Sequence, residues 1–280
     1  MKLLRVGPKG KEKPAILDNT GKIRDISSHI TDLNPDYLNF ETIAKLEKIN
    51  LLALPELSLS ERIGSCITKP GKFIAIGLNY SDHAAETGFQ VPTEPIVFMK
   101  ATSSINGPND DIEIVSGSKK LDWEVELGII IGKGAKHISE NQAQDHILGY
   151  CVVNDISERE WQIEKMGQWV KGKSHDTYGP IGPYLVTKDE IKDVNNLKMS
   201  LDVNGNRMQT GNTSTMVFNV NIIVSYLSKF MSLQPGDIIT TGTPPGVGMA
   251  MKPQKFLKAK DTMRLSIENL GEQNSKVAEL

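Results

Sequence analysis

Short apolar runs, separated by glycine, proline and asparagine, dominate the chain from Lys72 to its end. We predict a strand in each of the following runs: KFIAIGLN, PIVFMK, DIEIV, WEVELGIIIG, ILGYCVVND, GPYLVT, KMSLDVNG, DIITTG and TMRLSIENLG. Helical spacing of apolar residues is confined to short segments near 81–87, 157–168 and 219–231. Because the strands do not alternate regularly with helices, the pattern predicts a β-rich α+β domain rather than a doubly wound sheet.

The first 70 residues have a weaker pattern. The run KPAILDNTGKIRDIS predicts two short strands around a turn at residues 19–21, which together form a hairpin. Apolar residues within 39–49 are spaced as in a short helix. Pro70 and Gly71 make the best break before the strand-rich part. We therefore expect a small N-terminal domain over residues 1–70 and a catalytic domain over residues 71–280.

Composition and charge narrow the class of protein. With 280 residues the chain can bury a large core, and its net charge of −2 gives no sign of a nucleic-acid or membrane-surface partner. The two cysteines, Cys66 and Cys151, lie far apart in the sequence, which favours reduced thiols over a disulfide framework. No stretch is typical of a signal peptide or a transmembrane span. We expect a cytoplasmic protein that acts on a small molecule.

The run DWEVELGIII, residues 122–131, carries alternating carboxylates into an apolar strand. Side chains alternate between the two faces of a strand, so Asp122, Glu124 and Glu126 share one face. Two residues along a strand separate Glu124 and Glu126 by roughly 6.5–7 Å at the backbone, close enough for one ion. Like charges are costly to bury, and a divalent cation removes that cost. Oxygen ligands favour Mg²⁺, Mn²⁺ or Ca²⁺. The alternative is a solvated or salt-bridged strand face.

A second polar group follows the apolar run ILGYCVVN. Asp155 comes directly after this predicted strand, and Ser157 with Glu160 has the spacing of a capping box that begins a helix. Arg159 and Gln162 are three residues apart, so they share a face of that helix and are suited to an anionic substrate group. The alternative interpretation is an aspartate that caps a helix beside a surface arginine.

Three further segments carry candidate chemistry. In GLNYSDHAAE, His83 and Glu86 are three residues apart, and a carboxylate that orients an imidazole makes it a better general base. In WVKGKSHD, Lys171 and Lys173 lie near glycine, where a lysine can stabilise an oxyanion. The glycine-rich loop TTGTPPGVG precedes no predicted helix, which favours close approach of a ligand to its backbone over phosphate binding. Solvated side chains are the alternative for the histidine and the lysines.

Six segments taken in order resemble the fumarylacetoacetate hydrolase family: GLNYSDHAAE, PIVFMKATSSINGP, DWEVELGIIIGK, VVNDISERE, GKSHDTYGPIGP and TTGTPPGVG. The resemblance covers about residues 70–270. It implies a mixed β-sandwich or roll, a small N-terminal domain and a homodimer. The start of the chain is also similar to the subgroup that includes 2,4-diketo-3-deoxy-L-fuconate hydrolases.

The resemblance also implies roles for single residues, matched motif by motif. It assigns the metal to Glu124, Glu126 and Asp155, catalysis to His83, Glu86 and Lys173, and substrate binding to Arg159, Gln162 and Thr243. One position departs from the eukaryotic enzymes, which have an additional aspartate ligand where this chain has Leu78, Asn79 and Tyr80. We therefore expect three protein carboxylates on Mg²⁺ or Mn²⁺.

The activity that the resemblance implies is metal-dependent hydrolysis of a C–C bond in a 2,4-dioxo acid, which yields pyruvate and a carboxylic acid. The same site chemistry also serves an oxaloacetate-type decarboxylase, a hydroxymuconate or heptadienedioate isomerase, or a ureidoglycolate lyase. A metal-binding protein without catalysis is a third class. It is disfavoured because the histidine, the lysine and both ligand segments are intact.

Overall fold

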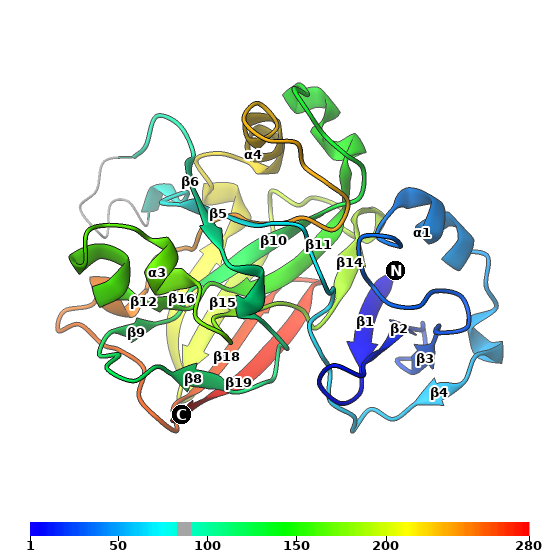
Figure 1. Cartoon of the computed structure of the whole chain (residues 1–280), viewed down its shortest axis with the longest axis horizontal. Helices are drawn as coiled ribbons and strands as arrows, with labels where there is room; N and C mark the ends of the chain where they lie inside the picture. Colours follow the sequence, from blue (N-terminus) through cyan, green and yellow to red (C-terminus); the bar gives the residue numbers. More distant parts are fainter. Residues whose placement is uncertain (83–90, 280) are drawn as a thin grey trace.

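The chain folds around two large sheets, and the computed structural model describes residues 1–82 and 91–279. The larger sheet has ten strands (Figure 1). Their order is β4 (Glu56–Leu57), β3 (Ile23–Asp25), β2 (Lys13–Leu17), β1 (Lys2–Val6), β14 (Leu185–Thr187), β11 (Ile147–Asn154), β10 (Val125–Ile131), β17 (Ile238–Thr240), β5 (Phe73–Gly77) and β6 (Ile96–Lys100).

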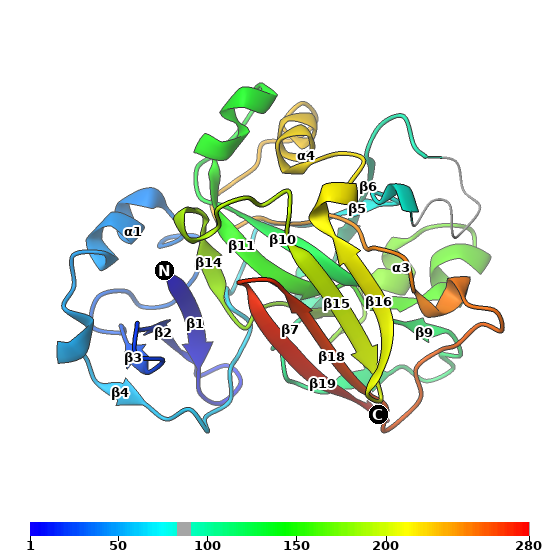
Figure 2. The same ribbon diagram turned by 180° about the vertical axis from the view of Figure 1, so that it is seen from behind.

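The second sheet lies against the middle of the first (Figure 2). Its order is β16 (Asn206–Asn212), β15 (Lys198–Val203), β18 (Thr262–Ile267), β19 (Gly271–Glu279) and β8 (Ile112–Ile114). Two short pairs are β12 (Ser157–Glu158) with β9 (Leu121–Asp122), and β13 (Gly179–Pro180) with β7 (Ile105–Asn106). Contacts of β10 and β11 with β15, β18 and β19 join the sheets into a sandwich.

Helical elements are short in the part of the chain that the structure describes. The α-helices are α1 (Phe40–Leu46), α3 (Val170–Lys173) and α4 (Val220–Leu227), and η4 (Glu160–Glu164) is a π-helical turn. The 3₁₀ turns are η1 (Leu51–Ala53), η2 (Thr102–Ser104), η3 (Glu140–Asp145), η5 (Lys188–Glu190), η6 (Thr213–Thr215) and η7 (Gly248–Ala250). Among these residues, no helix has both the length and the apolar composition that a membrane span requires.

The β-rich α+β fold predicted from the apolar runs is confirmed, since each predicted run contains a strand. The predicted hairpin is β2 and β3, and the predicted helices within 39–49 and 219–231 are α1 and α4. We did not predict β16 or β19, whose sequences NRMQTGN and GEQNSKVAE are mostly polar because much of each strand faces solvent. The helix predicted near 81–87 runs into residues 83–90, which lie outside the described residues.

The two faces of β10 contact different parts of the protein. Val125, Leu127 and Ile129 belong to the core between the sheets, where Trp123 also packs. On the opposite face, Ile130 belongs to a second core beneath α1 and the N-terminal strands. This alternation is the one that the sequence predicted. On this second face, near the start of β10, the side chains of Glu124 and Glu126 point into the site.

The N-terminal strands continue the large sheet. Strand β1 pairs with β2 on one side and with β14 on the other, so residues 1–70 share backbone hydrogen bonds with the rest of the chain. The domain boundary at Pro70 and Gly71 stays a prediction. Both cysteines, Cys66 and Cys151, are buried free thiols in the second core.

Candidate metal centre

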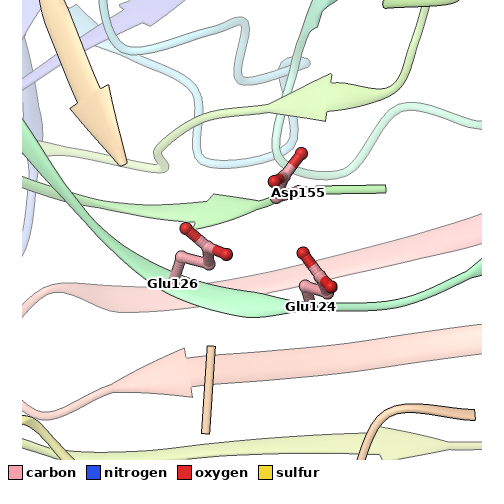
Figure 3. A group of neighbouring side chains, drawn as sticks. All are labelled: Glu124, Glu126 and Asp155. Atoms are coloured by element: carbon pink, nitrogen blue, oxygen red, sulfur yellow. The ribbon is translucent and has the colours of Figure 1, made fainter. Parts of the chain in front are cut away.

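Three carboxylates meet where β10 begins and β11 ends. Glu124 directly precedes β10, Glu126 is the second residue of β10, and Asp155 follows the last residue of β11 (Figure 3). The strands are antiparallel, and the Asp155 N–H donates to the Glu124 carbonyl at 2.9 Å, which holds the two side chains at one level. One oxygen from each carboxylate lies within 4.8 Å of the others, and all three residues are buried. Hard divalent cations prefer this set of donors.

Glu124 already has two cationic partners. Its Oε1 accepts from Arg159 Nη2 at 2.7 Å, and its Oε2 accepts from Lys173 Nζ at 2.7 Å. Burial opposes ionisation of this carboxyl, yet Lys173 and Arg159 outweigh burial and lower the pKa of Glu124 to about 2. Glu124 is therefore a carboxylate that is ready to bind a metal.

Glu126 has no cationic partner among the described residues, although it is only 2% exposed. Its Oε2 accepts from Thr240 Oγ1 at 2.5 Å and from the Gly242 N–H at 2.8 Å. Desolvation raises the pKa of Glu126 well above its usual value, and the nearby Asp155 and Glu124 raise it further. Glu126 is thus a buried carboxylate that has only neutral donors and lies beside two other carboxylates. A divalent cation would stabilise its ionised form.

Asp155 lies between two buried lysines. Its Oδ1 accepts from Lys100 Nζ at 2.6 Å and its Oδ2 accepts from Lys173 Nζ at 2.6 Å. Lys100 Nζ also donates to the Lys173 carbonyl, so Lys100 joins Asp155 to the turn that carries Lys173. Burial lowers the pKa of Lys173, but Asp155 and Glu124 outweigh burial and raise it above its usual value. Sequence reasoning did not single out Lys100; its only signal is its place as the charged last residue of the apolar run PIVFMK.

Arg159 is held from three sides. Its Nε donates to Asp122 Oδ2 at 2.8 Å and its Nη1 donates to Gln162 Oε1 at 3.0 Å, in addition to its contact with Glu124. Asp122 in turn accepts from the N–H groups of Gly248 and Met249. Asp122 therefore orients the arginine and is not one of the grouped carboxylates.

The predicted helix start at Ser157 and Glu160 is wrong. Ser157 lies in β12, where it pairs with Asp122, and its Oγ donates to the Asp155 carbonyl at 2.9 Å. Helical structure begins at Glu160 and lasts for the single turn η4, with no side-chain cap. The capping box does not form, because Ser157 pairs with β9 and the Glu160 N–H donates to Glu158 Oε1 at 3.1 Å instead of to Ser157.

The glycine-rich loop after β17 binds the site carboxylates through its backbone. Gly242 donates to Glu126 and Gly248 donates to Asp122, so the loop positions side chains of β10 and β9. The Thr243 hydroxyl donates to the Val125 carbonyl at 2.9 Å and accepts from Gln209 Nε2 at 2.8 Å. These contacts occupy the hydroxyl group of Thr243, although the residue lines the pocket beside the carboxylates.

A pocket of about 220 Å³ opens onto the three carboxylates. Glu124, Glu126, Asp155, Arg159, Gln162, Lys173 and Thr243, all predicted as site residues, line it. The predicted catalytic pair His83 and Glu86 lies outside the described residues. At the position where the eukaryotic enzymes have an additional aspartate, the Asn79 amide donates to the carbonyls of Phe218 and Thr241, which gives it a structural task.

Comparison with known families fits this geometry. The model of the "Fumarylacetoacetate (FAA) hydrolase C-terminal" region matches residues 72–278. The chain belongs to the fumarylacetoacetate hydrolase family. A relative named "Putative hydrolase" in Burkholderia orbicola (strain MC0-3) is 60% identical over 274 residues, which cover 98% of this chain and 97% of that protein.

Solved structures of this family include different reactions. The maleylpyruvate hydrolase of Sphingobium sp. SYK-6, in complex with manganese(II) ion and pyruvate, has a TM-score of 0.83 and 28% identity, and the match covers 100% of this chain and 99% of that one. The 2-hydroxyhepta-2,4-diene-1,7-dioate isomerase of Mycobacterium marinum has a TM-score of 0.78 and 32% identity, with coverage of 100% and 98%. This chain is therefore similar to a hydrolase and to an isomerase.

Proposed function

We propose that this protein hydrolyses the C–C bond of a 2,4-dioxo acid and releases pyruvate and a carboxylic acid. Glu124, Glu126 and Asp155 would hold the required Mg²⁺ or Mn²⁺. The observation that carries the proposal is the buried carboxylate group in which Glu126 has no cationic partner among the described residues. A family member that was solved with manganese(II) and pyruvate supports it.

The charge balance of the pocket favours an anionic substrate. Among the described residues, four carboxylates meet three cations: Asp122, Glu124, Glu126 and Asp155 with Lys100, Arg159 and Lys173. When all are ionised, one negative charge is in excess. A divalent cation would turn that excess into one positive charge, which matches the single carboxylate of an acylpyruvate.

Arg159 and Gln162 are the residues that would bind the substrate carboxylate. A guanidinium has five N–H donors, and Arg159 uses three of them on Asp122, Glu124 and Gln162. One N–H on each terminal nitrogen therefore stays available for a substrate oxygen. Because the Thr243 hydroxyl already has two protein partners, Thr243 would contribute through its backbone.

Proton transfer is assigned to the remaining catalytic residues. His83, oriented by Glu86, would take a proton from water as the oxygen attacks the carbonyl distal to the carboxylate. The C–C bond then breaks, its electron pair stays with the pyruvate fragment as an enolate, and Lys173 stabilises the negative charge. Return of the proton from His83 to the enolate carbon gives pyruvate. When bound, the metal would supply Lewis-acid polarisation of the 2-oxo acid and hold its orientation.

An isomerase is the second candidate, because the solved isomerase of Mycobacterium marinum is 32% identical to this chain. It would use the same enolate without an attacking water. Two further expectations stay predictions. One is that the substrate derives from a deoxy sugar acid, which rests on the similarity of the first residues to the 2,4-diketo-3-deoxy-L-fuconate hydrolase subgroup. The other is that the protein is a homodimer.

Labelled water separates these reactions. The Mn²⁺-loaded protein is incubated in H₂¹⁸O with acetylpyruvate, a 2,4-dioxo acid from a deoxy sugar, oxaloacetate or ureidoglycolate, and pyruvate is measured with lactate dehydrogenase. Hydrolysis places ¹⁸O in the new carboxylate of the second product. Turnover of oxaloacetate without turnover of any 2,4-dioxo acid would show a decarboxylase, and isomerisation would release no pyruvate.

A further inference from the structure

The pocket has an apolar side that the proposed chemistry does not use. Its side chains come from the end of β5, from β6, from residues 163–169 and from the loop after β17. We call them the apolar rim: Leu78, Phe98, Ile163, Trp169 and Met249. Four of them are half-buried and Ile163 is 42% exposed, so much of their surface faces the cavity or solvent.

The rim is held in place by packing. The rings of Phe98 and Trp169 meet edge to face with centroids 5.1 Å apart. Gly77 makes room for the indole, because a Cβ at this position would come within 2.6 Å of the Trp169 ring. On its other side, Phe98 has Lys173 Nζ 5.2 Å from its ring centroid. An apolar surface therefore begins directly beside the charged group that would stabilise the enolate.

The rim provides few partners for a hydroxyl group. Among the described lining residues, the uncharged side chains with hydrogen-bonding groups are Gln162, Thr243 and Trp169. The carbonyl oxygen of Gln162 is used by Arg159, and the Thr243 hydroxyl is used by Val125 and Gln209. The Trp169 indole N–H can only donate. A substrate hydroxyl placed here would therefore find, among the described uncharged side chains, no acceptor without a protein partner, and the loss of its bond to water is unfavourable.

Apolar exposure continues along the same segment. Met166 is 91% exposed and Val170 is 43% exposed, on either side of Trp169. These two residues do not line the pocket, but they extend the exposed apolar character of the segment that carries Trp169.

We propose that the apolar rim binds the acyl end of the substrate, and that this end terminates in an alkyl or aryl group. This inference rests on the proposed function, since it places the carboxylate and 2-oxo end of the substrate at Arg159 and the three carboxylates. The acyl end then extends from the attacked carbonyl across Phe98 toward Trp169. Substrates with a terminal hydroxyl are the disfavoured class.

Two matched substrate series test the rim. In the first, acylpyruvates are lengthened one methylene at a time, and kcat/KM is expected to rise about fourfold per methylene until the rim is covered. In the second, 2,4-dioxohexanoate is compared with its 6-hydroxy derivative, and the alkyl-ended compound is expected to react about tenfold faster or more at equal concentration. A flat first series, or a preference for the hydroxylated compound, would overturn the inference.

Variants connect the preference to the rim. Trp169→Ala is expected to reduce the gain per methylene to less than about twofold, and Trp169→Phe is expected to retain most of it. Phe230→Ala, which removes an exposed aromatic ring that does not line the pocket, is the matched control and should leave the gain unchanged. An unchanged gain in Trp169→Ala would contradict the assignment of this residue.

Binding of unreactive acids separates this inference from the proposed function. Calorimetry of 2-oxobutanoate through 2-oxooctanoate with the Mn²⁺-loaded protein requires no hydrolysis. If no 2,4-dioxo acid is cleaved but affinity still rises about fourfold per methylene, the hydrolase proposal fails and the rim stands. If acylpyruvates are cleaved and affinity is flat, the rim fails and the hydrolase stands.

Discussion

A cluster of acidic and basic side chains in the N-terminal part differs from the cluster in the pocket in how its carboxylates are compensated. The N-terminal cluster consists of Arg5, Glu12, Asp32, Arg62 and Asp110. The pocket cluster consists of Lys100, Asp122, Glu124, Glu126, Asp155, Arg159 and Lys173. Every carboxylate of the N-terminal cluster contacts an arginine, whereas Glu126 of the pocket cluster contacts no cation among the described residues.

The difference shows which feature of an ionic cluster indicates a ligand. Glu12 has one oxygen on Arg5 and the other on Arg62, so its charge is compensated within the chain. Glu126 is more deeply buried than Glu12 and is held by Thr240 and Gly242, which are neutral. A buried carboxylate with neutral donors is costly unless a cation from outside the chain binds it. The missing partner, rather than the number of acidic residues, marks the candidate metal centre.

The largest expected effect is that of Glu126→Gln. The substitution removes a ligand with little change in shape, so we expect Mn²⁺ affinity to fall at least about 100-fold and hydrolysis to fall with it. Calorimetric titration measures the affinity, and circular dichroism checks that the fold is retained. An unchanged Mn²⁺ affinity would show that Glu126 is not a metal ligand and would refute the distinction between the clusters.

Lys173→Met should separate catalysis from metal binding. Its ammonium contacts Glu124 and Asp155, so its removal frees two carboxylates, and metal affinity should not decrease. Turnover should fall about 100-fold with little change in KM, because the charge acts mainly on the developing enolate. Lys171→Met is the control, since Lys171 is exposed and donates to the Lys165 carbonyl. Weaker metal binding in Lys173→Met would indicate a structural role.

Lys100→Met should have an intermediate effect. Lys100 is 1% exposed and holds Asp155 and the Lys173 carbonyl together. We expect the free energy of unfolding to decrease by about 3 kcal/mol and metal affinity to decrease about tenfold, because Asp155 loses its orientation. Denaturant unfolding and calorimetry measure the two quantities, with the exposed Lys11→Met as control. A loss of stability without any loss of affinity would limit Lys100 to packing.

Glu12→Gln should leave the pocket unaffected. It weakens two contacts with arginine in the N-terminal cluster, so we expect a decrease of about 1–3 kcal/mol in the free energy of unfolding. Mn²⁺ affinity and kcat/KM should stay within about twofold of the original protein. Metal binding that responded to Glu12→Gln as strongly as to Glu126→Gln would refute the distinction between the two clusters.

Local pattern was sufficient for many of the strands and for part of the site. The alternation in DWEVELGIII predicted that Glu124 and Glu126 share a face, and the pattern placed Asp155 at the end of the next apolar strand, whereas its place beside the two glutamates was implied by the family resemblance. These inferences hold because side-chain alternation in a strand is a property of the backbone itself. The capping box at Ser157 failed for the complementary reason: Ser157 pairs with Asp122, which comes from a distant segment, and the Glu160 N–H bonds Glu158 instead.

The sequence by itself therefore determined the β-rich class, the shared face of the two glutamates and the family motifs. Only the tertiary structure decided which charges compensate one another: that Lys100 binds Asp155, that Asp122 orients Arg159, and that Glu126 is left with neutral donors. It also brought Phe98 and Trp169 together beside the pocket. Alternation along a strand is set by neighbouring residues. The pairing of buried charges depends instead on contacts between segments far apart in the chain, which local pattern does not specify.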